Sequence, residues 1–105
     1  MTSGALKLLT ILVEPEIANR LAEELMGQGA RGYSLFPGRG KWQRGLTSAG
    51  GVVSDWEGEN VRIETVVPPR VADAVFAHLR EHYFPYYAIF AYTADVAVER
   101  VERYS

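Results

Sequence analysis

The stretch LKLLTILVEPEIANRLAEELMGQG, residues 6–29, decides the fold because its hydrophobic period changes at a proline. Residues 6–13 form a short, mostly apolar run, which is typical of a central strand buried on both faces. The pair Glu14-Pro15 is favourable in the first turn of a helix, where acidic side chains and proline are both well placed. An apolar stripe then recurs every four residues and predicts an amphipathic helix, at Ile17, Leu21 and Leu25.

The second half of the chain repeats this pattern of a strand followed by a helix. Residues 60–67 alternate between two faces, as a strand does, and Pro68-Pro69 then begins a second helical pattern. Two further strands are expected over residues 30–37 and 87–98. The order predicts an α+β fold of the ferredoxin-like βαββαβ kind, with a four-stranded antiparallel sheet and two helices on one face.

The composition is that of one ordinary globular domain spanning residues 1–105. The chain has eleven basic and thirteen acidic residues, so its formal net charge of -2 excludes a global basic field for nucleic acid or anionic lipid. It has no cysteine, which excludes disulfide scaffolds, thiolate metal sites and cysteine nucleophiles. No apolar run approaches the roughly 20 residues of a bilayer span, and residues 1–4 lack the basic start of a signal peptide. We therefore expect a cytoplasmic protein without membrane insertion.

Placing both helices on one face of the sheet leaves the other face uncovered. The expected strands nevertheless carry leucine, isoleucine, valine, phenylalanine and tyrosine on that face as well. A bare apolar face of this size is a liability in a monomer. We therefore expect other copies of the chain to cover it, most simply in a closed ring.

An aperiodic segment, residues 37–58, follows the second expected strand and holds six of the ten glycines. It opens with GRGKWQRG, residues 38–45, where glycine lets the backbone approach an anion so that exposed N–H groups can contact phosphate oxygens. Arg39, Lys41 and Arg44 add positive charge, and arginine suits bidentate phosphate contacts. The stretch is not a P-loop, because no Gly-Lys-Ser/Thr ends it and no helix follows. A solvated basic loop is the alternative.

Several pieces of the chain together resemble the PII-like proteins. They cover nearly the whole chain and comprise the opening strand, GARGY at 29–33, GRGKWQRG, NVRIE at 60–64, and HYF at 82–84 followed by Tyr87-Ala88. The resemblance is strongest to PII-like proteins tied to inorganic-carbon uptake, namely the SbtB type and the carboxysome-associated type. We favour the carboxysome-associated type, because the chain stops soon after its last strand, without the cysteine-containing extension of many SbtB proteins.

The resemblance implies a homotrimer with nucleotide sites in the clefts between subunits, at the base of a long T-loop, here about residues 38–58. It implies nucleotide-binding roles for one group at the loop base: Gly38, Arg39, Gly40, Lys41, Gln43 and Arg44. It implies the same role for a second group in the C-terminal tail: Arg100 and Arg103. Arg44 matches a phosphate-contacting arginine of the SbtB type, whereas Thr47 stands where that type has a second arginine.

The resemblance also implies ligands and partners. Classical PII proteins carry a Gly-rich, lysine-bearing loop for ATP phosphates where this chain has Pro85-Tyr86-Tyr87. We therefore expect ADP or AMP as ligand, with bicarbonate as a second ligand and no prosthetic group. The expected protein partner is a bicarbonate transporter or another carboxysome-related protein. Residues 46–58 contain no tyrosine, so regulation by uridylylation is not expected.

Other interpretations stay open at this point. His78 and His82 have the spacing of a helical metal site, so a trimeric metal-binding protein of the CutA kind is the alternative, although no third ligand is evident. An RNA-binding domain of this strand order would need aromatic residues on its third strand, and residues 60–67 have none. The sequence shows no nucleophile beside a base, so it does not indicate an enzyme. Arg100 and Arg103 also fit a solvated charged terminus.

Two sets of aromatic residues have no assigned chemistry. Trp42 and Trp56 lie in the aperiodic segment, where they could stack on a base or fold back on the domain. The aromatic residues of 83–87 are expected to fill the core or a subunit interface, because such clusters usually do.

Overall fold

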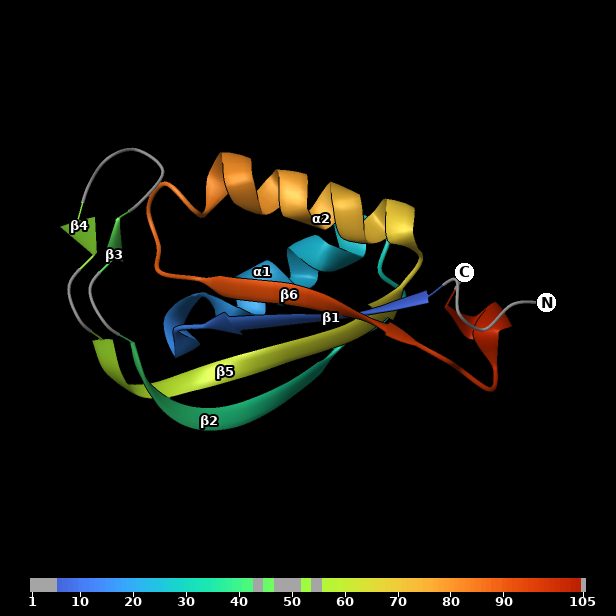
Figure 1. The fold of residues 1–105 in the computed structure, drawn as a ribbon, viewed down its shortest axis with the longest axis horizontal. Helices are drawn as coiled ribbons and strands as arrows, with labels where there is room; N and C mark the ends of the chain where they lie inside the picture. Colours follow the sequence, from blue (N-terminus) through green and yellow to red (C-terminus); the bar gives the residue numbers. More distant parts are fainter. Residues whose placement is uncertain (1–5, 43–44, 47–51, 54–55, 105) are drawn as a thin grey trace.

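The computed structural model describes residues 6–42, 45–46, 52–53 and 56–104. Its main elements are β1 (Leu6–Val13), α1 (Pro15–Gly27), β2 (Ser34–Trp42), β5 (Trp56–Val67), α2 (Pro69–His82) and β6 (Phe90–Val96). Four strands form one antiparallel sheet in the order β2-β5-β1-β6, and both helices lie on the same face of it (Figure 1). The predicted ferredoxin-like fold is therefore confirmed.

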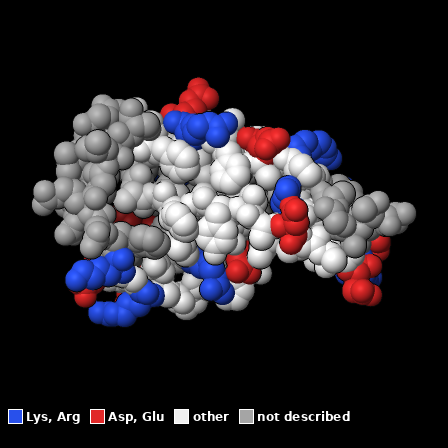
Figure 2. All heavy atoms as spheres, in the orientation of Figure 1, with Lys and Arg blue, Asp and Glu red and all other residues white. Residues whose placement is uncertain are grey.

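The subunit is elongated, with a longest dimension of 45 Å. One end carries the β2–β5 hairpin, which leads to a second, two-stranded sheet of β3 (Gly45–Leu46) and β4 (Val52–Val53). The other end carries the C-terminal turn η2 (Val101–Arg103) (Figure 1). In the same orientation, basic side chains with acidic ones among them lie at the end where β2 and β5 run together, and further charged side chains are scattered over a mostly uncharged surface (Figure 2).

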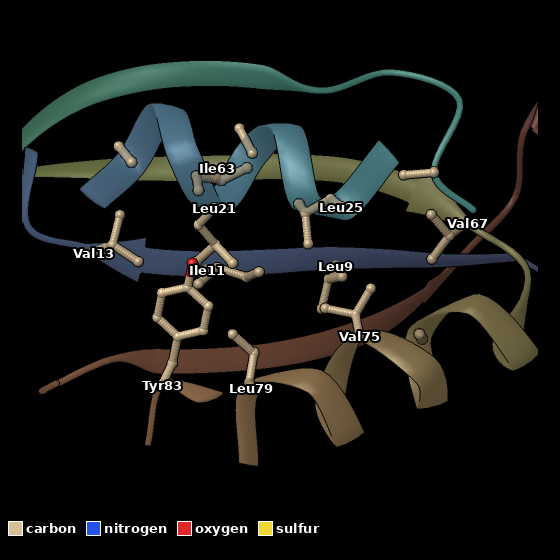
Figure 3. Close-up of a cluster of buried hydrophobic side chains, with 14 of the residues drawn as sticks. Leu9, Ile11, Val13, Leu21, Leu25, Ile63, Val67, Val75, Leu79 and Tyr83 are labelled. Atoms are coloured by element: carbon tan, nitrogen blue, oxygen red, sulfur yellow. The ribbon is translucent and has the colours of Figure 1, made fainter. Parts of the chain in front are cut away.

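The core lies between the sheet and the helices. Alternate residues of β1, such as Leu9 and Ile11, face the helices and are fully buried, as the period of a strand requires. Leu21 and Leu25 of α1 and Val75 of α2 close over them (Figure 3). The predicted apolar stripe of the first helix is thus confirmed, and the second helix also has a buried apolar stripe. Neither helix in the described part of the chain is long and apolar enough to cross a membrane.

The first helix ends at Gly27, and Gly29 lies two residues beyond it. Its φ is +118°, a conformation that residues with a side chain rarely adopt. A Cβ at this position would also lie 3.1 Å from Cγ2 of Val71 on α2. The glycine therefore lets the chain leave α1 while passing closely against α2.

The aperiodic segment expected at 37–58 begins and ends in regular strand, which corrects the sequence analysis. β2 runs to Trp42 rather than ending at Pro37, and β5 begins at Trp56 rather than at Asn60. The short strands β3 and β4 were also not predicted. The sequence does not predict these strands because this segment is rich in glycine. Glycine is depleted in strands and removes the alternation of side chains by which a strand is recognised.

The sheet face opposite the helices carries a row of large side chains. The register places Phe90, Leu12, Arg62 and Phe36 side by side across the four strands, on a shared face. Phe36 is 38% exposed, Phe90 49% and Tyr92, further along β6, 44%. The guanidinium carbon of Arg62 lies 4.5 Å from the centre of the Phe36 ring, which is cation–π geometry. This is the uncovered apolar face that the sequence predicts.

Candidate ligand-binding site

The first group of expected ligand-binding residues lies on the β2–β5 hairpin. Arg39 and Lys41 are exposed and lie two residues apart on β2, so they project from the same face of the strand. The register pairs Arg39 with Glu59 and Lys41 with Glu57, and Nζ of Lys41 lies 4.0 Å from Oε1 of Glu57. Lys41 therefore has a carboxylate partner across the hairpin, with which an anionic ligand must compete.

Gly38 and Gly40 of β2 lie at the positions that face the other side of the strand. Gly38 lies across from Asn60, and a Cβ at Gly38 would lie only 2.6 Å from Oδ1 of that side chain. Gly40 lies across from Gly58, whose φ is +145°. Packing of Asn60, which is 8% exposed, thus explains Gly38 without a ligand. Because β2 is an edge strand, alternate N–H groups point away from β5 and stay open to an anion.

The second group lies around a surface hollow of about 540 Å³ at the opposite end of the subunit. The hollow is lined by Arg31, Gly32, Val98, Glu99, Arg100, Arg103 and Tyr104. The amide of Arg103 donates to the carbonyl of Arg100 over 3.1 Å, so one short turn carries both arginines. Among the described residues, none forms a hydrogen bond or ion pair with either guanidinium group. Both cations are therefore available to an anion.

Arg31 is a basic member of this hollow that the sequence does not indicate as a site residue. It lies in the connection between α1 and β2, and a lone exposed arginine in a connection indicates no site. The signal that could have found it is the predicted topology. β2 and β6 run in opposite directions across the sheet, so the start of β2 and the end of β6 lie at the same end. That topology brings Arg31 beside the C-terminal arginines.

The structure does not bring the two groups together within one chain. Arg39 lies five residues after the start of β2 at Ser34, roughly 17 Å along the strand, and Arg31 precedes that start. The hairpin and the C-terminal turn lie at opposite ends of the subunit (Figure 1). Gln43 and Arg44, also expected at the loop base, lie outside the described residues. A ligand of nucleotide size that contacts both groups therefore needs two copies of the chain.

The family model of the nitrogen regulatory protein P-II matches residues 6–103. The chain belongs to the P-II family. A candidate PII-like signalling protein from Thermus thermophilus is 41% identical over 95% of both chains, with a TM-score of 0.77. P-II proteins are regulatory proteins rather than enzymes, and their family is one of trimers. No curated protein matches the chain.

More distant structures share the fold of this P-II protein. CPII from Thiomonas intermedia K12, bound to ADP and bicarbonate, has a TM-score of 0.78 at 19% identity, over 95% of this chain and 94% of CPII. CutA from Synechococcus elongatus PCC7942 has a TM-score of 0.67 at 19% identity, over 92% of this chain and 81% of CutA. At these identities the similarity extends to the fold alone, and the ferredoxin-like topology is common to both.

The turn after α2 comprises Tyr83-Phe84-Pro85-Tyr86-Tyr87, the segment that the resemblance places where classical PII proteins carry their phosphate loop. Its amides are used within the chain: those of Phe84, Tyr86 and Tyr87 donate to the carbonyls of Leu79 and Tyr83 over 2.7–2.9 Å. They are therefore not available to bind a triphosphate. β6 begins only after this turn, later than the expected start at Tyr87.

A polar cluster between the two helices holds this turn in place. Oε1 of Glu24 accepts a hydrogen bond from the Tyr83 hydroxyl at 2.8 Å and lies 2.7 Å from Nε2 of His78. Arg20 donates to the hydroxyl groups of Tyr83 and Tyr87 over 3.2 and 3.5 Å. The cluster ties α1, α2 and the turn to one another.

Hydrogen bonding within this cluster shifts the pKa of its members. Burial alone would raise the pKa of Glu24, but the hydrogen bonds with His78 and Tyr83 outweigh it, so the pKa of Glu24 is lower than usual. Burial and the hydrogen bond to Glu24 raise the pKa of Tyr83. Hydrogen bonds to Tyr87 and Tyr83 raise the pKa of Arg20. Glu24 and Arg20 are therefore held in their charged forms.

The candidate metal ligands give no support to the CutA-like alternative. The rings of His78 and His82 lie 4.8 Å apart between centres, but Nε2 of His78 is already in contact with Glu24. Across the part of the chain that the structure describes, no three histidine, aspartate or glutamate side chains are arranged to hold a metal ion.

The aromatic residues of the turn are divided between core and surface. Tyr83 is 2% exposed, and Phe84 and Tyr87 pack against the core, which confirms the expectation for these three. Tyr86 is 71% exposed, so its burial in an interface stays a prediction. The side chains of Trp42 and Trp56 lie outside the described residues.

Proposed function

We propose that the chain forms a homotrimer that binds ADP or AMP in the clefts between subunits and signals the inorganic-carbon or energy state of the cell. The observation that carries the proposal is the placement of two basic groups, Arg39 with Lys41 and Arg100 with Arg103, at opposite ends of one subunit. In a closed ring, the hairpin end of one copy can lie beside the C-terminal end of the next. The uncovered apolar sheet face supplies a surface that holds such a ring together.

The charged residues of this cleft bind the phosphates of the nucleotide. Arg39, Lys41 and Arg44 of one subunit and Arg100 and Arg103 of its neighbour neutralise the phosphates, with arginine suited to bidentate contact. The uncharged members of the site complete it at the hairpin end: Gly38, Gly40 and Gln43.

The proposed ligand is a mono- or diphosphate rather than ATP. The turn that follows α2 uses its amides internally and has neither glycine nor lysine to hold a third phosphate. CPII, which shares the fold, has been solved with ADP and bicarbonate and with ADP, AMP and acetate. We extend this to bicarbonate as a second, small-anion ligand of the present chain.

The proposed output is a change in the T-loop, about residues 38–58, that alters what it binds. Because β2 leads directly into that segment, a nucleotide held by Arg39 and Lys41 acts on its base. A coupling of about 1–3 kcal/mol is enough to shift partner affinity usefully. The chain is then a cytoplasmic regulator of the carboxysome-associated PII-like type, whose partner is a bicarbonate transporter or another carboxysome-related protein.

Isothermal titration calorimetry with ADP, AMP, ATP and cyclic AMP tests the ligand. We expect ADP and AMP to bind more tightly than ATP, and Arg44→Ala to weaken both. Failure of all four nucleotides to bind at millimolar concentration would discard the proposal.

Mixed trimers test whether the cleft is shared. The double variants Arg39→Ala/Lys41→Ala and Arg100→Ala/Arg103→Ala each damage one end of every subunit, so each alone should bind ADP poorly. When the two are co-expressed with different tags, about one quarter of the clefts in random trimers regain both intact ends. Recovery of that fraction of wild-type sites supports a shared cleft. No recovery in verified mixed trimers contradicts it.

A further inference from the structure

The hollow at the C-terminal end is lined mainly by basic side chains. Among the described residues that line it, Arg31, Arg100 and Arg103 are basic and Glu99 is acidic. The arginines come from two segments far apart in the sequence, the α1–β2 connection and the C-terminal turn. Gly32, beside Arg31, adds no side chain, and a Cβ there would meet nothing within 4 Å, so the hollow stays open.

Arg31 differs from arginines elsewhere that the chain uses for its own packing. Arg20 donates to two tyrosine hydroxyls, and Nε of Arg62 lies 3.1 Å from a carboxylate oxygen of Glu64. Arg31 is exposed and forms no hydrogen bond or ion pair with any other residue that the structure describes. Holding three like charges around one hollow is unfavourable unless an anion joins them.

We propose that Arg31 is a third anion-binding arginine of the hollow and favours ligands with more than one phosphate charge, while Glu99 limits their affinity. This rests on the proposed function and identifies residues in one half of its cleft. Three guanidinium groups can contact more phosphate oxygens than two, so Arg31 should favour ADP over AMP. The carboxylate of Glu99 repels either ligand.

Calorimetry on the full chain with ADP, AMP and adenosine tests the proposal. Arg31→Ala should weaken the binding of ADP about tenfold, as expected for the loss of one charge-assisted hydrogen bond, and should weaken the binding of AMP less. Arg31→Lys, which keeps the charge, should recover part of the loss. Glu99→Gln should tighten the binding of ADP about threefold, because it removes the repulsion between the Glu99 carboxylate and the phosphates. Arg70→Ala is the matched control, since Arg70 is an exposed arginine outside the hollow.

Each remaining outcome has a separate meaning. If the wild-type chain binds no adenine nucleotide, the proposed function fails, and the role of Arg31 fails with it. If the wild type binds ADP and Arg31→Ala behaves like Arg70→Ala, only the role of Arg31 is overturned. It is also overturned if Arg31→Ala weakens adenosine as much as ADP, because Arg31 then contacts the nucleoside rather than the phosphates. Unchanged circular dichroism and melting temperature exclude misfolding at this exposed position.

Discussion

The two ends of the subunit hold their positive charge in different ways. On the hairpin, Lys41 lies 4.0 Å from Glu57, and Arg39 faces Glu59 across the strands. Among the described residues that line the C-terminal hollow, three are arginines and one, Glu99, is acidic. Exposed ion pairs contribute little and largely cancel one another's field, whereas unpaired guanidinium groups attract anions. The difference indicates a division of labour, in which the hollow supplies most of the affinity, and the hairpin supplies the rest and transmits the ligand's presence to the loop.

The largest expected effect comes from separating the two ends of neighbouring subunits. Tyr92→Glu places a charge on the uncovered sheet face, where Tyr92 is 44% exposed. Burying an unpaired carboxylate in a subunit interface is strongly unfavourable, so the ring should dissociate and ADP binding should be lost. Light scattering coupled to size exclusion reports the first effect, and calorimetry the second. Met26→Glu, at a comparably exposed apolar residue on α1 (41%), is the control and should leave both unchanged. A monomer that still binds ADP normally would show that one end suffices.

The next largest effect tests whether the C-terminal hollow contributes more to ADP affinity than the hairpin does. Arg100→Ala/Arg103→Ala removes two cations that have no partner among the described residues, so ADP should bind about 100-fold more weakly. Removing a cation together with its carboxylate, in Lys41→Ala/Glu57→Ala, leaves the local charge unchanged and should cost only about threefold. Calorimetry with ADP compares the two. Equal losses would contradict the division of labour.

Gly38 tests whether the hairpin glycines serve packing or the ligand. A Cβ at this position would lie 2.6 Å from Oδ1 of Asn60, so Gly38→Ala should destabilise the fold by about 1–3 kcal/mol. Asn60→Ala removes the clash, so the second substitution should cost less in the Gly38→Ala background than alone. Urea unfolding of the single and double variants measures this coupling. If the two free-energy changes are strictly additive, packing against Asn60 does not explain Gly38, and close approach of the backbone to an anion explains it better.

The Glu24 cluster shows charges that the chain satisfies by itself. Glu24→Gln should lower the free energy of unfolding by about 1–2 kcal/mol at neutral pH, because His78 and Tyr83 lose a carboxylate acceptor. The pKa of Glu24 is lowered in the folded state. Its contribution is therefore complete above the unfolded pKa of roughly 4.3 and is lost as pH falls through the folded value. Urea unfolding from pH 7 to 3 should show the two proteins converging in acid, with ADP affinity at neutral pH unchanged. A gap that does not narrow as the pH falls would show that the carboxylate is not its cause.

The sequence predicts the fold far better than the site, for a physical reason. The helical stripes and the strand at 6–13 are local patterns imposed by burial, and the structure confirms them. The strands at 38–42 and 56–59 carry glycines and paired charges instead of an alternating apolar face, so nothing in their local pattern marks them as strands.

The candidate site depends on contacts between distant parts of the chain. Arg39 and Lys41 can be picked out as a charged stretch, but their pairing with Glu59 and Glu57 follows only from the register of the hairpin. Arg31 joins the C-terminal arginines only because β2 begins where β6 ends. Such proximity is a product of topology, and a single sequence read along its length does not display it.

The smallest expected effect is at the hairpin carboxylate. Glu57→Gln releases Lys41 from a partner 4.0 Å away and removes a negative charge that competes with phosphate. Both side chains are more than two-thirds exposed, at 73% and 69%, so water screens the pair and ADP should tighten by only about two- to threefold. The gain should shrink as salt is raised from 0.05 to about 0.5 M, because the Debye length falls with ionic strength. Asp73→Asn, an exposed carboxylate on α2, is the matched control and should leave ADP affinity unchanged. A gain at Glu57 as large as the loss at the C-terminal arginines would mean that the hairpin, rather than the hollow, sets the affinity.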